Sequence, residues 1–64
     1  MLGSIIRGIH RILVQDSTGL TRFGLAIKPD AQTHITSEGL VVQEGNFVRV
    51  IDEKGMTVRA YYAQ

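Results

Sequence analysis

The sequence contains no cysteine and no tryptophan, and its 64 residues include a single proline. Without cysteine, the chain has neither disulfide bonds nor thiolate-ligated zinc, which are two common ways of stabilising so short a domain. The two histidines, His10 and His34, are too far apart in the sequence to suggest a metal site, and we expect no metal and no cofactor. A domain of this size buries only about 60% of the surface of its unfolded chain. We therefore expect one domain over residues 1–64 that is stabilised by self-association or by a protein partner.

No run of about 20 apolar residues occurs, so we expect no membrane-spanning segment. Seven basic and six acidic residues give a net charge of +1, and the basic residues are spread along the chain. This balance does not by itself favour binding to nucleic acid. The absence of cysteine is compatible with the cytoplasm, and we expect a protein that is cytoplasmic or associated with the cytoplasmic side of a membrane.

Turn-forming residues recur at short intervals along the chain. Glycine and asparagine allow positive φ, and aspartate and serine bond to their own local backbone, so each cluster can reverse the chain direction. The intervening runs are rich in β-branched and aromatic residues, which is typical of a small sandwich or barrel. We find no internal repeat. The turn clusters are residues 16–19, 29–30, 37–39, 43–46 and 52–55.

The clearest predicted strand covers residues 47–52, where Phe47 and Arg49 alternate with valines. Residues 56–62 follow it after a glycine-containing turn, so the two segments are predicted to form a hairpin. Further strands are predicted at residues 20–28 and 32–36, and residues 40–42 form either a strand or a segment that crosses the bottom of the barrel.

The N-terminal segment is ambiguous. Its apolar residues, which include Ile5, Ile9 and Ile12, occur at helical spacing and would occupy an arc of about 120°. Such an amphipathic helix would place these three isoleucines against a membrane or a sister subunit. The β-branched content and the internal Gly3 and Gly8 favour instead a strand over residues 9–14. We prefer the strand and keep the helix followed by a small barrel as the alternative.

Downstream of Gly24, the chain carries a series of small turns and a Val-x-Val strand. The series consists of Ser37-Glu38-Gly39, then Gly45, then Val48-Arg49-Val50, then Gly55. In this pattern the chain resembles the soluble C-terminal domain of NfeD-like proteins, an OB-type barrel of five strands. The resemblance implies an all-β, five-stranded OB-like barrel. It also implies a docking or assembly role beside stomatin-type membrane proteins. Independently of the family, we expect Val48, Val50 and Val58 to fill the barrel interior, with Ile27 and Ile35 beside them.

No recognisable catalytic arrangement accompanies this fold. Every carboxylate lies in or beside a predicted turn, the serines have no nucleophile motif, and there is no phosphate-binding loop. We therefore expect a non-enzymatic protein–protein interaction module with no small-molecule substrate. Strand alternation suggests a partner-binding patch of aromatic and basic residues. This patch comprises Phe47, Arg49, Arg59 and Tyr61.

Two other functions fit the sequence. OB barrels bind single-stranded nucleic acid through aromatic and basic side chains, which the same patch would supply. A small structural or assembly subunit with an amphipathic N-terminal segment is the third hypothesis.

Overall fold

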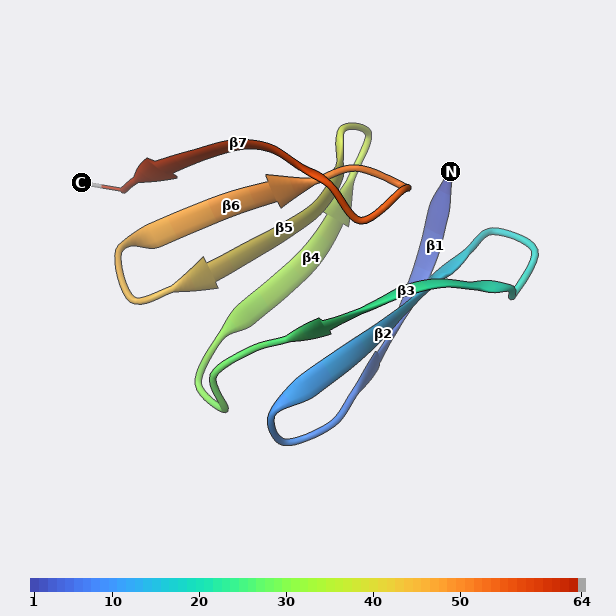
Figure 1. Cartoon of the computed structure of the whole chain (residues 1–64), viewed down its shortest axis with the longest axis horizontal. Coiled ribbons are helices and arrows are strands. Elements are labelled where there is room, and N and C mark those ends of the chain that lie inside the picture. The colour runs from blue at the N-terminus through green and yellow to red at the C-terminus, as the bar shows by residue number, and fades with distance from the viewer. Residues whose placement is uncertain (64) are drawn as a thin grey trace.

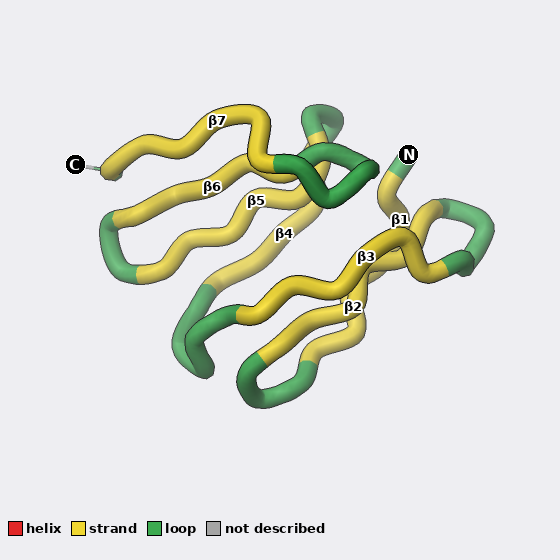
Figure 2. The backbone as a smooth tube through the Cα atoms, viewed as in Figure 1, coloured by secondary structure: helices red, strands yellow, loops and turns green. Residues whose placement is uncertain are grey.

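Two antiparallel sheets make up the protein (Figure 1). The computed structural model describes residues 1–63. The N-terminal sheet contains β1 (Leu2–Arg7), β2 (Arg11–Asp16) and β3 (Thr21–Ala26). The C-terminal sheet contains β4 (Gln32–Thr36), β5 (Gly39–Glu44), β6 (Phe47–Ile51) and β7 (Thr57–Tyr62). Each strand pairs with the next one along the chain within its sheet, so both sheets are meanders joined by short turns (Figure 2).

The all-β prediction is confirmed, but the architecture differs from a five-stranded closed barrel. The described residues form seven strands, and the two sheets do not join into one closed sheet. All five predicted turn clusters coincide with chain reversals. The missed reversal lies at residues 8–10, where the N–H of Gly8 donates to the carbonyl of Arg11 at 2.8 Å. This turn divides the N-terminal segment into two strands.

The helical alternative for the N-terminus is wrong. β1 and β2 form an antiparallel pair in which Ile5 lies opposite Val14, and Ile6 lies opposite Leu13. β-Branched side chains pack well in such cross-strand pairs but lose rotamer freedom in a helix. Pairing with β2 therefore outweighs the helical spacing of the isoleucines.

The hydrophobic core lies between the two sheets. Ile12 and Val14 of β2 are fully buried, as are Leu40 and Val42 of β5. Because alternate residues of a strand point to opposite faces, each of these pairs lies on the inner face of its sheet. Burial of one such side chain contributes roughly 1.5–3 kcal/mol, so this layer dominates the stability. The core cluster comprises Leu2, Ile12, Val14, Ile27, Ala31, Leu40, Val42 and Ile51.

Turns of one sheet pack against the other sheet at the margins of the core. Gly55, in the turn between β6 and β7, lies so close to Phe23 of β3 that a Cβ there would be 3.2 Å from the ring. The backbone N–H of Lys28 donates to the carboxylate of Glu44 at 3.0 Å. These contacts fix the position of the C-terminal sheet, which carries the candidate site.

One type of hairpin turn occurs twice in the protein. Asp16-Ser17-Thr18-Gly19-Leu20-Thr21 joins β2 to β3, and Asp52-Glu53-Lys54-Gly55-Met56-Thr57 joins β6 to β7. In each turn the N–H of the aspartate donates to the carbonyl four residues on, at 2.9 Å. The two turns share Asp, Gly and Thr at the same offsets and have dissimilar residues between them.

Candidate protein-interaction surface

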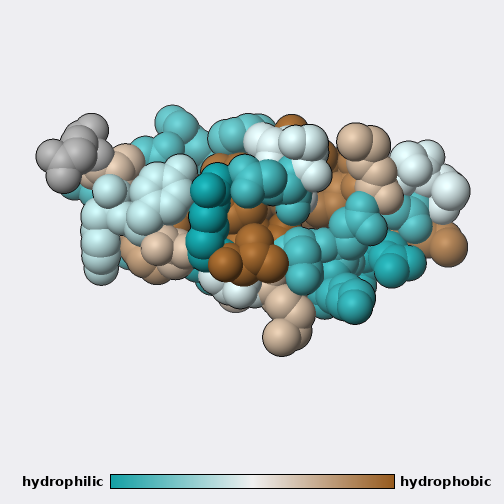
Figure 3. All heavy atoms as spheres, turned by 90° about the horizontal axis from the view of Figure 1, so that it is seen from above, coloured by the Kyte–Doolittle hydropathy of each residue, from teal (hydrophilic) through white to brown (hydrophobic). Residues whose placement is uncertain are grey.

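β7 lies at the edge of the C-terminal sheet and is exposed along its whole length. Among residues 1–63, no strand pairs with the edge of β7 that faces away from β6. Val58 is 54% exposed, Tyr61 47% and Tyr62 75%. Valine and tyrosine favour strand formation. They are exposed here because the N-terminal sheet does not cover β7. Seen from above, apolar side chains lie exposed between polar ones on this side of the molecule (Figure 3).

The four residues predicted to form one patch lie on two faces of the sheet. Phe47 is paired with Tyr62, whereas Val48 is paired with Tyr61 and Val50 with Arg59. Directly opposed residues in an antiparallel pair share a face, and successive residues alternate. Phe47 and Arg49 therefore lie on the inner face of the sheet, and Arg59 and Tyr61 on the outer face. Alternation within each strand was predicted correctly, but the pairing register decides which faces coincide.

On the inner face, beyond the core, the side chains hold one another in place. The rings of Phe47 and Tyr62 are 5.2 Å apart between centroids and tilted by 53°. The guanidinium of Arg49 donates to the carboxylate of Glu44 at 3.3 Å, and both side chains are largely buried. Glu44 also accepts the bond from the backbone of Lys28. Arg49 is thus part of the framework that joins β5, β6 and the inter-sheet loop.

On the outer face, Arg59 and Tyr61 flank two buried valines. Val48 and Val50 are 4% and 1% exposed, yet they lie on the face that points away from the core. The guanidinium of Arg59 lies 5.8 Å from the ring centroid of Tyr61 and 2.8 Å from the carboxylate of Glu38. Val48 and Val50 therefore do not fill a barrel interior as expected, and the exposed Val58 does not either.

The three N-terminal isoleucines do not form one contact stripe. Ile12 is fully buried in the core, Ile5 is half-buried, and Ile9 is 74% exposed in the turn between β1 and β2. Sequence reasoning also missed Val58 and Tyr62 as surface candidates. A signal for both was present, because residues 56–62 were predicted to form a hairpin with residues 47–52, and this hairpin pairs the strand on one side only.

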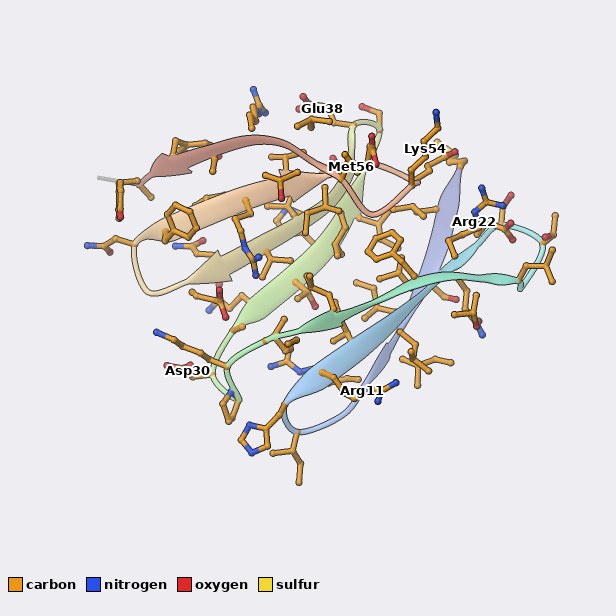
Figure 4. All side chains as sticks on the ribbon, viewed as in Figure 1. Arg11, Arg22, Asp30, Glu38, Lys54 and Met56 are labelled. Carbon is orange, nitrogen blue, oxygen red and sulfur yellow. The ribbon has the colours of Figure 1, made fainter. Side chains whose placement is uncertain are left out.

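Three carboxylates lie in two turns of the C-terminal sheet, one turn between β4 and β5 and the other between β6 and β7. Glu38, Asp52 and Glu53 border a depression of about 290 Å³ beside Leu2. Figure 4 shows Glu38 and Lys54 on this side of the molecule. Each carboxylate has a partner: Glu38 bonds Arg59, Glu53 bonds the amino group of Met1, and Asp52 accepts bonds from its own turn. Within residues 1–63, no three histidines or carboxylates are placed to hold a metal ion.

Asp16 has a perturbed acidity that is explained by its turn. The hydroxyl of Thr18 donates to its carboxylate, and the backbone N–H groups of Thr18 and Leu20 donate to the same oxygen at 2.9 and 3.1 Å. These bonds favour the ionised form and lower the pKa of Asp16 below its ordinary value. The lowered pKa of Asp16 is therefore explained by hydrogen bonds that stabilise its turn.

No family model, curated protein or solved structure matches the chain. The resemblance to NfeD-like proteins therefore gains no support from these comparisons and stays a prediction. The described residues include no helix long and apolar enough to cross a membrane.

Proposed function

We propose that the chain is a non-enzymatic protein-interaction module that binds an extended protein segment along the outer edge of β7. The observation that carries this proposal is the exposure of β7 as an edge strand with no pairing partner among residues 1–63. An edge strand offers a row of N–H and C=O groups to an added strand, and alternate side chains give specificity. Here the flanking side chains would be Val58, Tyr61 and Tyr62.

The distribution of charge favours protein over nucleic acid as the partner. Arg49 bonds Glu44, Arg59 bonds Glu38, and Arg22 lies 3.9 Å from Asp16. A nucleic-acid surface needs cations that are available to phosphates and that lie together with stacking aromatics. These arginines are neutralised within the chain, and the aromatic and basic residues lie on two faces. The single-stranded nucleic-acid hypothesis is accordingly the weaker one.

The partner class that the NfeD-like resemblance implies is a stomatin-type membrane protein, which is one candidate for the source of the extended segment. The exposed strand does not by itself specify this partner. It specifies a partner that contributes an extended segment.

A peptide-display selection tests the proposal. Random ten-residue peptides are selected on the immobilised chain, and binding clones are counter-screened on an Ala60→Pro variant. Proline at an outward-facing edge position removes the donor for an added strand but no bond of the native sheet. An Ile9→Lys variant changes another exposed position, far from β7, and is the matched control.

We expect the peptides of the binding clones to be rich in alternating β-branched and aromatic residues. They should bind the Ile9→Lys variant and fail to bind the Ala60→Pro variant. Clones that bind all three proteins equally would refute strand addition at β7. A stomatin-type protein is titrated onto the three proteins in parallel, and the same pattern would identify it as a partner. A single-stranded oligonucleotide is the third probe. If it binds with steep salt dependence while the peptides do not bind, the nucleic-acid hypothesis replaces ours.

A further inference from the structure

We infer that the segment added to β7 is the β7 strand of a second copy, paired antiparallel about a two-fold axis that passes midway between the two Ala60 residues, perpendicular to the sheet. This inference rests on the proposed function and names its partner. The two C-terminal sheets would become one continuous sheet. Such an interface is isologous, with the same residues contributed from both sides.

The backbone of β7 is oriented for this pairing. The N–H of Ala63 donates to the carbonyl of Asn46 at 2.7 Å, so these two residues form a hydrogen-bonded pair across β6 and β7. Hydrogen-bonded and non-hydrogen-bonded pairs alternate along an antiparallel ladder. The register from Phe47↔Tyr62 to Arg49↔Ala60 is regular, so Tyr62 and Ala60 direct their N–H and C=O groups away from β6. In a second β7 strand centred on Ala60, the same N–H and C=O groups would face these and could form hydrogen bonds with them.

The side chains select this register over its neighbours. With Ala60 opposite Ala60, Arg59 lies opposite Tyr61 of the second copy on one face, and Val58 lies opposite Tyr62 of the second copy on the other. Arg59 already lies over Tyr61 within one chain, so the pair across the axis extends a contact of the same chemistry. A register centred on Arg59 would place two guanidinium groups directly opposite each other, which is unfavourable. A register centred on Tyr61 leaves a shorter overlap of the strands.

Among residues 1–63, β7 is the one edge strand whose residues are all exposed, whereas β1, β3 and β4 each include partly buried residues. β1 and β7 each have one bulge, and the bulge of β7 falls before Arg59 and leaves the run from Arg59 to Tyr62 regular. β4 is a mostly polar strand, and it packs beside β1. In β7, Thr57 to Tyr62 has no proline and a single charged side chain, Arg59, which is neutralised by Glu38. Pairing through β7 also supplies burial that a domain this small lacks by itself.

Single-cysteine variants test the register in a chain that has no cysteine of its own. Ala60→Cys would place the two thiols beside the axis, within the Cα separation that a disulfide accepts. We expect Ala60→Cys to form a disulfide-linked dimer under mild oxidation on the order of tenfold faster than Ile9→Cys, whose residue is exposed but remote. Arg59→Cys and Tyr61→Cys report the two neighbouring registers. If either cross-links faster than Ala60→Cys, the proposed register is wrong.

Light scattering after size-exclusion chromatography tests the association without any added thiol. We expect the wild-type chain and Ile9→Lys to show twice the 7.1 kDa chain mass, and Ala60→Pro to show the mass of one chain. A wild-type chain that stays monomeric at about 1 mM, which corresponds to less than about 4 kcal/mol of association energy, would overturn the inference. So would a dimer that Ala60→Pro leaves intact. A monomer whose β7 edge still captures selected peptides would refute the second copy as partner while leaving the proposed function standing.

Discussion

Asp16 and Asp52 occupy the same position in two copies of one hairpin turn. The carboxylate of Asp52 accepts the N–H groups of Lys54 and Met56 at 2.9 and 3.0 Å, and Asp16 accepts those of Thr18 and Leu20. In both hairpins the pairing register shifts by one residue beside the turn. The same local chemistry thus closes one hairpin in each sheet, and the second of these hairpins orients β7.

Replacing Asp52 by alanine is expected to destabilise the protein by about 1 kcal/mol, because two backbone donors lose their acceptor. Asp52→Asn keeps an acceptor oxygen and is expected to cost less. Urea unfolding followed by circular dichroism measures both. Equal losses for the two variants would show that charge, rather than the turn hydrogen bonds, is what Asp52 contributes.

The stability of the protein is expected to fall in acid through Asp16. Its pKa is lowered in the folded state, first by the bond from the Thr18 hydroxyl, so the unfolded chain binds the proton more readily. The contribution of Asp16 is therefore fully present above about pH 4, the ordinary range of the carboxyl, and is lost as the pH falls through the lowered folded pKa. Urea midpoints between pH 2.5 and 6, for wild type and Asp16→Asn, measure it. The asparagine variant should depend less on pH in this window, and parallel curves would contradict the assignment.

Gly39 and Gly45 both have positive φ, at 136° and 61°, but differ in the space around them. A Cβ on Gly39 would lie 2.2 Å from the carbonyl oxygen of Ile51, whereas one on Gly45 meets nothing within 4 Å. Gly45→Ala is expected to cost about 1–2 kcal/mol from the left-handed backbone alone. Gly39→Ala adds a clash with backbone that cannot move aside, so we expect a larger loss or no folding. Similar thermal midpoints for the two variants would contradict the close approach of β5 to β6.

Ile12 and Ile9 distinguish the two-strand N-terminus from a helical stripe. Ile12→Ala removes a fully buried side chain and is expected to cost roughly 2–5 kcal/mol. Ile9→Ala changes an exposed turn residue and is expected to shift stability by no more than about 0.5 kcal/mol. Urea unfolding measures both. Equal effects would indicate that the two isoleucines share one environment, as a helix would require.

Much of the local structure could be predicted from the sequence, because turn residues act over two to four positions. The strands predicted at residues 32–36, 47–52 and 56–62 correspond to β4, β6 and β7. β5 was predicted too short, and the break at residues 8–10 was missed. That break has Gly8 but none of the Asp, Asn or Pro residues that mark most of the other turns.

The candidate site was less predictable. Arg49 and Arg59 belong to adjacent strands and have the same residue type, and the sequence gives no reason to separate them. The pairing of Val50 with Arg59 places them on opposite faces, and each guanidinium then bonds a different glutamate. The number of strands, and the fact that the two sheets do not close into a barrel, could likewise not be predicted from the sequence pattern.

The sequence by itself determined that this chain is all β and where most of its turns fall, because glycine, aspartate and asparagine act on their own neighbourhood. It also determined which residues of each strand share a face. Only the tertiary structure decided that two sheets pack face to face instead of closing into a barrel, and that Val48 and Val50 are buried away from the core. It also decided that β7 is left as an exposed edge. These outcomes depend on the register between strands and on the area that one sheet can cover on the other, both of which are set by contacts between residues distant in the chain.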